Sequence, residues 1–357
     1  MIAPYVAVAC QMTMRPVYKG ADTPFRPECI KENLDRVCAM VERAAREHQA
    51  KLAVFPEFCV QGYALQRSIA DWERAGVLLP GPETAAMAKV ARATGVHIAG
   101  AVYERIPDFP GRYFMSGFVI SPEGATPEAQ LRLVYRKVYA LTHKTRPGDI
   151  YDQYVAKFGR AALFPVIDTP LGKVGCAVAA DIAWPEIPRA LAMRGAELIF
   201  NPTAAGRIPG YASASEDADQ PLAPAMPMVR RMRAWENVMY LAMANIGPFL
   251  DDDGRVGAER IPSEVIDYQG RVIARADTEG EAIVPALIDI AALRAYRAQP
   301  KANFLAQLQP RLHAQDYDAM QLCPLNGMAT PHAEEKEADD FIVATWKRMV
   351  ATGTFHG

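Results

Sequence analysis

The chain has 357 residues, of which half are apolar and 22% are charged, and its formal net charge is −2. This composition is typical of a globular protein, and the charge balance excludes a basic surface for nucleic acid or for an anionic membrane. No apolar run approaches the roughly 20 residues that a membrane-spanning helix needs. The opening residues, MIAPYVAVACQM, predict a first strand and not a signal peptide, so we expect a cytoplasmic protein.

Short β-rich runs alternate with helical stretches along most of the chain. Several of these runs are continuously apolar, as expected for strands that are covered on both faces. The predicted strands are 5–11, 51–56, 96–103, 113–121, 131–137, 163–168, 173–179, 197–201, 239–246, 264–275 and 282–288. Apolar residues at helical spacing predict helices over 28–48, after Pro82, from about Trp184 to Gly195, and over 226–237.

Two segments fall outside this alternation. Residues 204–225 are rich in Gly, Pro, Ser and Ala and predict a long loop. Residues 300–357 show little apolar periodicity, and such a tail frays unless something holds it, so we expect it to pack across another subunit. We divide the chain into a domain over 1–295 and a C-terminal extension over 296–357.

The cysteines and histidines are scattered, six of each, without a Cys-x-x-Cys pair or a metal-ligand spacing of histidines. This distribution indicates reduced thiols and predicts neither a disulfide framework nor a metal site. We expect no cofactor.

Three strand ends carry the residues that could perform chemistry. Glu57 follows the apolar run KLAVFP, Lys137 ends the strand LRLVYRK, and Ala179 ends a third strand just before a helix. Hydrolysis of an amide needs a nucleophile, a base that moves a proton, and a cation or N–H pair for the developing oxyanion. Glu57 suits the base and Lys137 suits the electrostatic stabiliser. The nucleophile is missing.

Five segments carry a family resemblance when they are taken together, in their order and spacing. They are VFPEFCVQGY, LPGPETAAMAKVARATGVHIAGAVYE, YRKVY, GKVGCAVAADIAWPEIPRALAMRGAELIFNPT and RAWENVMYLAMANIGP. Over about residues 5–290 the chain resembles the nitrilase superfamily of carbon–nitrogen hydrolases. The resemblance implies an α/β fold, a four-layer α-β-β-α sandwich, and a homodimer or larger homo-oligomer.

The resemblance also implies a cysteine nucleophile at the position of Ala179. The backbone N–H of Ala180 would then join Lys137 in holding the oxyanion of an acyl-enzyme. Alanine has no lone pair to offer, so we expect this chain to be inactive. The favoured explanation is a deliberate Cys→Ala replacement, and a natural pseudoenzyme is the alternative. Cys176 lies three residues too early along the strand, about 10 Å away, to substitute.

Relatives carry a second glutamate soon after the lysine, but residues 138–157 contain none. Asp149 is the candidate replacement, and an aspartate that merely orients the turn after Pro147-Gly148 is the alternative. We expect the pocket to be lined by Tyr63, Tyr139, His143, Asp149 and Trp184, with packing roles as the alternative for the aromatic residues and a hydrogen-bonded loop position for the histidine. Met115 stands where relatives commonly show Asn.

The best functional reading is an amidase that hydrolyses a small carboxamide to acid and ammonia. An N-carbamoyl-amine hydrolase is a close rival, and a nitrilase is a weaker one because residues 179–181 read Ala-Ala-Asp. A non-catalytic ligand-binding protein is the alternative from another class. We expect specificity to come from the loops 139–160 and 204–225.

Overall fold

The structure is a computed structural model that describes most of the chain. The described ranges are 2–19, 23–62, 67–139, 145–207, 225–251, 254–256, 259–320, 322–331 and 335–354. None of the helices in these ranges is long and apolar enough to cross a membrane.

Two half-sheets are joined where β1 pairs in parallel with β10, with Met12 opposite Ile246. The first half contains, in spatial order, β5 (Leu131–Arg136), β4 (Phe114–Ile120), β3 (His97–Glu104), β2 (Leu52–Val54), β1 (Tyr5–Met14) and β15 (Ala282–Ile288). The second half contains β6 (Val166–Thr169), β7 (Gly172–Cys176), β8 (Leu198–Thr203), β10 (Tyr240–Asp251), β13 (Glu264–Ile266) and β14 (Val272–Arg275). Short pairings add β11 (Gly254–Val256) to β10 and join β9 (Gly206–Arg207) to β12 (Glu259–Arg260).

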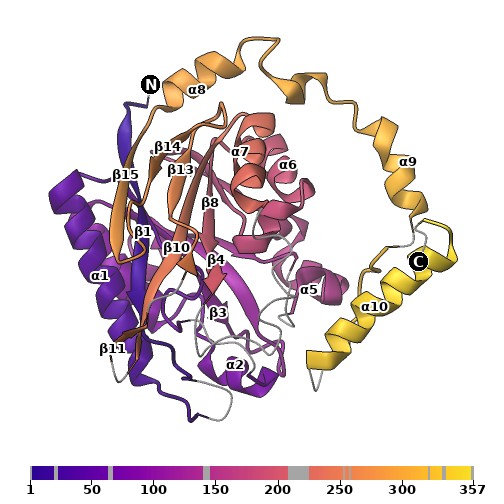
Figure 1. Cartoon of the computed structure of the whole chain (residues 1–357), viewed down its shortest axis with the longest axis horizontal. Helices are drawn as coiled ribbons and strands as arrows, with labels where there is room; N and C mark the ends of the chain where they lie inside the picture. Colours follow the sequence, from indigo (N-terminus) through magenta and orange to yellow (C-terminus); the bar gives the residue numbers. More distant parts are fainter. Residues whose placement is uncertain are drawn as a thin grey trace.

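Alternation along β1 separates two apolar layers, because successive strand side chains point to opposite faces. Ala7 and Ala9 belong to the core that lies between the half-sheets. Val8 and Cys10 belong to the core under the helices α1 (Glu28–His48) and α3 (Pro82–Thr94). The helices α6 (Glu186–Met193) and α7 (Met226–Asn237) cover the other half-sheet, as Figure 1 shows. The predicted four-layer sandwich is therefore confirmed.

The predicted bounds of the helices 28–48 and 226–237 and of the strand 282–288 match the structure. The prediction of one strand over 264–275 is wrong, because the chain turns at 267–271, where Asp267 Oδ1 accepts the N–H groups of Gln269 and Arg271. The predicted loop 139–160 contains η1 (Pro147–Ile150) and α5 (Tyr151–Phe158). The predicted strand 163–168 begins in η2 (Arg160–Leu163) and becomes β6 only at Val166. The predictions also omit α2 (Ile69–Ala75), α4 (Pro127–Gln130) and α8 (Ile290–Arg297).

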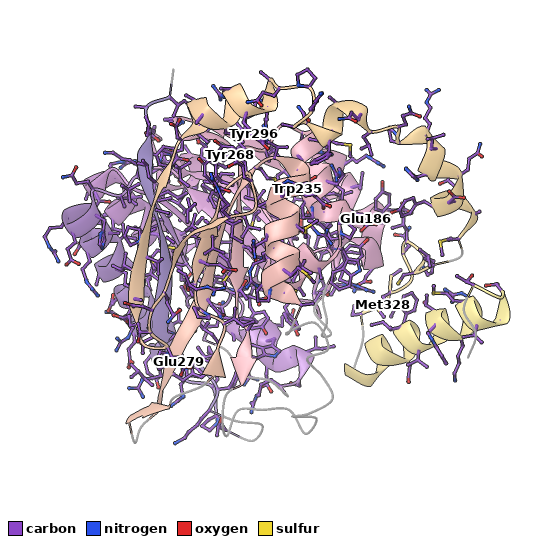
Figure 2. The ribbon with its side chains drawn as sticks, turned by 45° about the horizontal axis from the view of Figure 1, so that its top comes forward. Glu186, Trp235, Tyr268, Glu279, Tyr296 and Met328 are labelled. Carbon is purple, nitrogen blue, oxygen red and sulfur yellow. The ribbon has the colours of Figure 1, made fainter. Side chains whose placement is uncertain are left out.

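The C-terminal extension forms an arm with helices of its own. After α8 it passes through η4 (Phe304–Gln307), α9 (Arg311–Ala319) and α10 (Glu335–Ala351). Figure 1 shows the arm leaving the body at α8 and curving round to α10 on the far side of α5. α8 itself is held to the body, since the ring centroids of Tyr296 and Tyr268 lie 5.1 Å apart. Figure 2 labels both residues beside α8.

The arm contacts its own chain at several places: Tyr317 on α9 donates to Glu186 Oε1 at 2.7 Å, and the ring of Phe304 packs on Trp235 of α7. A further contact is made by residues 325–331, which we call the latch. The buried Arg112 donates from Nη2 to Met328 O at 2.6 Å and to Ala329 O at 2.8 Å. Asn326 N–H donates to Gly148 O at 2.8 Å, and Met328 N–H donates to the backbone oxygen of Asp149. The latch therefore adjoins η1, and Figure 2 shows Met328 on the side of the body that the arm faces.

Candidate functional site

The centre of the site is a buried ion pair between two of the predicted residues. Lys137 Nζ lies 2.9 Å from Glu57 Oε1, and both side chains are almost fully buried. Glu57 follows β2 and Lys137 follows β5, so the pair joins the ends of two strands of the first half-sheet. A buried pair of this kind persists only where the geometry is good, because each charge has lost its water.

The backbone beside Glu57 is held in an unusual conformation. Phe58 has φ of 63°, in the left-handed region that L-residues rarely adopt. Phe55 N–H and Cys59 N–H donate to the backbone oxygens of Ala99 and Ala101 on β3 and so fix the turn on both sides of Glu57. Such strain persists only where the surrounding structure enforces it, and it is concentrated at functional sites.

The third predicted position, Ala179, also has a positive φ, of 44°. It opens a 3₁₀ helix, η3 (Ala179–Ala183), whereas β7 already ends at Cys176, so the prediction that Ala179 ends the strand 173–179 is wrong by three residues. Asn201 of β8 donates from Nδ2 to Ala177 O at 2.7 Å and to Ala179 O at 3.1 Å. Five described non-glycine residues have positive φ. Two of them, Gln49 and Val238, end helices. Two others, Phe58 and Ala179, lie at this site.

The far end of η3 is fixed by α7. Arg233 donates from Nε to Ile182 O at 3.1 Å and from Nη2 to Ala183 O at 3.0 Å. Glu236 in turn accepts from Arg233 Nη1 at 3.0 Å. The conspicuous Glu236 of the RAWEN segment therefore supports the turn at residue 179 through Arg233.

Asp181 connects this turn to the lysine segment. It has no exposed surface. The Tyr135 hydroxyl donates to its Oδ2 at 2.7 Å, and Tyr139 N–H donates to its Oδ1 at 2.8 Å. Burial raises the pKa of Asp181 to about 6, while the nearby ammonium of Lys137 opposes the rise. The segments that contain residues 137 and 179 are thus bound directly to one another.

Cys176, the rejected substitute nucleophile, is fully buried where the two half-sheets come together. A Cβ on Gly117 of β4 would collide with its Sγ. Burial raises the pKa of the thiol well above its usual range, and the nearby Asp181 carboxylate raises it further. A thiol in this setting is a poor nucleophile because the thiolate is the reactive form.

Two of the predicted pocket residues lie against each other. The rings of Tyr139 and Trp184 are stacked, with centroids 4.7 Å apart and planes 23° apart. Both side chains are half-buried, as is Ala180. Tyr139 is also the residue whose N–H binds Asp181, so the aromatic pair adjoins the connected segments.

Asp149 is buried, and its carboxylate is engaged within η1. Its Oδ2 accepts from Arg146 N–H at 2.8 Å, and its Oδ1 pairs with Arg146 Nη2 at 2.7 Å. These bonds match the turn-orienting alternative for Asp149. Tyr63 and His143 lie outside the described residues, as do most of the predicted specificity loop 204–225 and part of 139–160.

Within the described residues no group of three His, Cys, Asp or Glu side chains is placed to hold a metal ion. All six cysteines are free thiols. The groups that the structure describes at the site are the carboxylates of Glu57 and Asp181, the ammonium of Lys137 and the backbone N–H groups.

Sequence reasoning did not single out Asp181, Asn201 or Arg233 as site residues. Each acts through a partner far away in the sequence, and a single sequence gives no sign of such pairings. The Asn-Pro-Thr that ends β8 is a weak signal at most.

The chain is similar to known proteins over most of its length. The family model for carbon–nitrogen hydrolase matches residues 7–298. The human omega-amidase NIT2 is 28% identical over 269 residues, which cover 75% of this chain and 87% of that protein.

Two solved structures share the fold. The first is a double mutant of the amidase from Nesterenkonia sp. AN1, with cysteine-to-alanine among its changes, in complex with acrylamide. It has a TM-score of 0.58 and 20% identity, and the match covers 87% of this chain and 96% of that one. Saccharomyces cerevisiae Nit3, a nitrilase superfamily member, has a TM-score of 0.59 and 21% identity over 83% of this chain and 94% of that one. From the family match over residues 7–298, this chain belongs to the carbon–nitrogen hydrolase family.

Proposed function

We propose that this site is an amidase site that lacks only its nucleophile, and that the chain binds a small carboxamide without cleaving it. The observation that carries the proposal is the buried Lys137–Glu57 pair, bound through Asp181 to a strained turn at residue 179. The omega-amidase activity of the curated relatives supports the choice of an amide.

In the proposed reaction a cysteine at position 179 attacks the amide carbon and Glu57 moves the proton to the leaving ammonia. Lys137 and the N–H of Ala180 hold the oxyanion, and water then releases the acid from the thioester. Losing the nucleophile of a coupled catalytic set costs a factor on the order of 10⁶ in turnover. The methyl group of Ala179 leaves room for the intact amide.

We propose that the acyl part of the amide lies against the Tyr139–Trp184 stack. This pair offers a flat, half-buried aromatic surface that begins two residues after the oxyanion stabiliser. A related amidase with alanine in place of cysteine has been obtained with acrylamide bound, which supports uncleaved binding of an amide here.

The test is an Ala179→Cys variant incubated with simple carboxamides, ω-amides of dicarboxylic acids, N-carbamoyl amines and nitriles, with released ammonia as the readout. We expect release from one of the amide classes and none from the parent chain. Release from the carbamoyl or nitrile class alone would move the assignment to those rivals. No release from any class, by a folded variant, would favour a non-catalytic binding protein.

The origin of Ala179 has its own test, which is the codon at position 179 in the native gene. A cysteine codon there means a deliberate replacement. An alanine codon means a natural pseudoenzyme, and the ligand-binding function then stands alone.

We also propose that the chain forms a homodimer through the α6–α7 face. Four large apolar side chains are exposed there: Met193, Met228, Met232 and Trp235. Trp235 is labelled on this face in Figure 2. Further apolar side chains, among them Leu312 on α9 and Trp346 on α10, are exposed along the arm, which a second copy could cover.

A further inference from the structure

The lysine segment is held on both sides of Lys137 by one carboxylate. The Tyr135 hydroxyl donates to Asp181 Oδ2 at 2.7 Å, and Tyr139 N–H donates to Asp181 Oδ1 at 2.8 Å. Tyr135 lies two residues before the lysine and Tyr139 two residues after it. The two oxygens of Asp181 therefore span the lysine position.

The same carboxylate belongs to the turn that starts at residue 179. Asp181 N–H donates to Val178 O at 3.0 Å, within the first turn of η3. With Asn201 holding Ala177 O and Ala179 O, the position of Asp181 relative to residue 179 is set by short covalent and hydrogen-bonded paths.

Lys137 needs such external fixing because its side chain is long and flexible. Glu57 holds the ammonium itself, at 2.9 Å. The backbone of the lysine is held on one side by Met115 O, which accepts Lys137 N–H at 2.9 Å. This bond fixes the lysine to its own half-sheet, but it does not set the distance to residue 179, which follows a strand of the other half-sheet.

We propose that Asp181 is a positioning residue that sets the distance between the Lys137 ammonium and residue 179, across the gap between the two half-sheets. The inference rests on the proposed function, because it takes Lys137 as the oxyanion stabiliser. Asp181 does not touch the substrate in this proposal. It makes the site productive by holding the cation and the nucleophile position in register.

The test uses the Ala179→Cys variant as the starting enzyme and adds Asp181→Asn, which keeps the size of the side chain. Asn can still accept the Tyr139 N–H but cannot accept the Tyr135 hydroxyl with a second oxygen. Misplacement by about 1 Å costs about 10²-fold in rate, so we expect kcat to fall by about 10- to 100-fold while KM stays within about threefold. Tyr135→Phe removes the same bond but leaves the carboxylate of Asp181 on the Tyr139 N–H, so it should give a smaller loss of kcat.

The matched control is Glu197→Gln. Glu197 is also a buried carboxylate that accepts from a backbone N–H and a side chain, namely Lys173 N–H and Arg294. It precedes β8, at the end of the strand opposite to Asn201, so its loss should not change kcat beyond about twofold. Retention of kcat in the Asp181→Asn variant, or an equal loss in the Glu197→Gln variant, would overturn the proposal.

A second measurement separates failure of this inference from failure of the proposed function. In the parent chain, hydrogen exchange of residues 131–139 is compared with that in an Asp181→Ala variant. Faster exchange confined to this segment supports the connection even if the Ala179→Cys variant releases no ammonia. Unchanged exchange at Tyr139 rejects the connection whatever the activity.

Discussion

Ala179 adopts a backbone conformation that an alanine rarely takes, with φ of 44°. Glycine adopts it freely, whereas an L-residue loses roughly 1–2 kcal/mol there. The larger entropy of glycine in the unfolded chain offsets part of this gain, so we expect Ala179→Gly to raise the free energy of unfolding by up to about 1 kcal/mol. Urea denaturation of the parent chain and of the variant measures this change in the free energy of unfolding.

The control for this prediction is Ala180→Gly, in the same 3₁₀ helix but outside the positive-φ positions. It should lower stability by roughly 0.5–1 kcal/mol. Equal losses in both variants would show that residue 179 is not strained, and the argument from backbone conformation would fail.

Asp181 gives the protein a pH dependence with a definite sign. Burial raises its pKa from the ordinary 3.8 to about 6, against the opposing effects of Lys137 and of the Tyr135 and Tyr139 bonds, while the neighbouring Cys176 thiol stays neutral. The folded state therefore binds the proton more tightly than the unfolded state. The stabilisation is complete below about pH 4 and is lost as the pH rises through about 6.

Relative to Asp181→Asn, the parent chain should thus lose up to about 3 kcal/mol of unfolding free energy between pH 4 and pH 7. Denaturation of both proteins at four pH values measures the difference. Glu197→Gln is a control for which the pH dependence has the opposite sign. Burial alone would raise the pKa of Glu197, but the Arg294 hydrogen bond and the Lys173 N–H lower it, so the parent chain should gain stability relative to this variant as the pH rises. If the difference in unfolding free energy between the parent chain and the Asp181→Asn variant did not change with pH, the prediction would be contradicted.

At the scale of elements, strands and helices differ in how far local sequence specifies them. The helices 28–48 and 226–237 were predictable because one apolar face recurs with helical spacing against a charged face. The hairpin β13–β14 was not, since the turn depends on Asp267 accepting two backbone N–H groups across Gly270, and both flanking runs are equally β-prone.

The residues of the candidate site also differ in how far the sequence alone could identify them. Glu57, Lys137 and residue 179 could be named because the segments that contain them resemble the family's motifs in order and spacing, and each residue follows an apolar run. Asp181, Asn201 and Arg233 could not, because each acts on a backbone group supplied by another element. Long-range polar pairings leave no period in the sequence.

The latch is the element whose attachment is most open to test. Arg112→Met keeps the length of the stem and removes both bonds to Met328 O and Ala329 O. Hydrogen bonds from a charged donor contribute about 1.5–3 kcal/mol each, so residues 322–331 should exchange and be cleaved by proteases much faster.

Arg92→Met is its control, because Arg92 also donates to a carbonyl, Gly124 O at 2.6 Å, at a site on α3 away from the arm. It should leave the latch protected. If the latch were as well protected from exchange and proteolysis in the Arg112→Met variant as in the parent chain, the bonds from Arg112 would not be what holds it.

At the scale of the whole molecule, the exposed apolar side chains of α6 and α7 are the main feature that one chain leaves unexplained. A charge introduced among them should break a dimer, so Met232→Glu should turn a dimer into a monomer at micromolar concentration. Light scattering after size-exclusion chromatography gives the mass. Val272→Glu, at an exposed position on β14, is the control. A parent chain that runs as a monomer would reject the proposed dimer.

The central claim is that an amide bound to this chain meets Lys137, Glu57 and residue 179 at once. The most direct measurement is a crystal structure of the chain, as it stands, with a carboxamide bound. We predict an intact amide with its oxygen at hydrogen-bond distance from Lys137 Nζ and its carbon facing the Ala179 methyl. An amide bound elsewhere, with Glu57 and Lys137 left paired only to each other, would contradict the account.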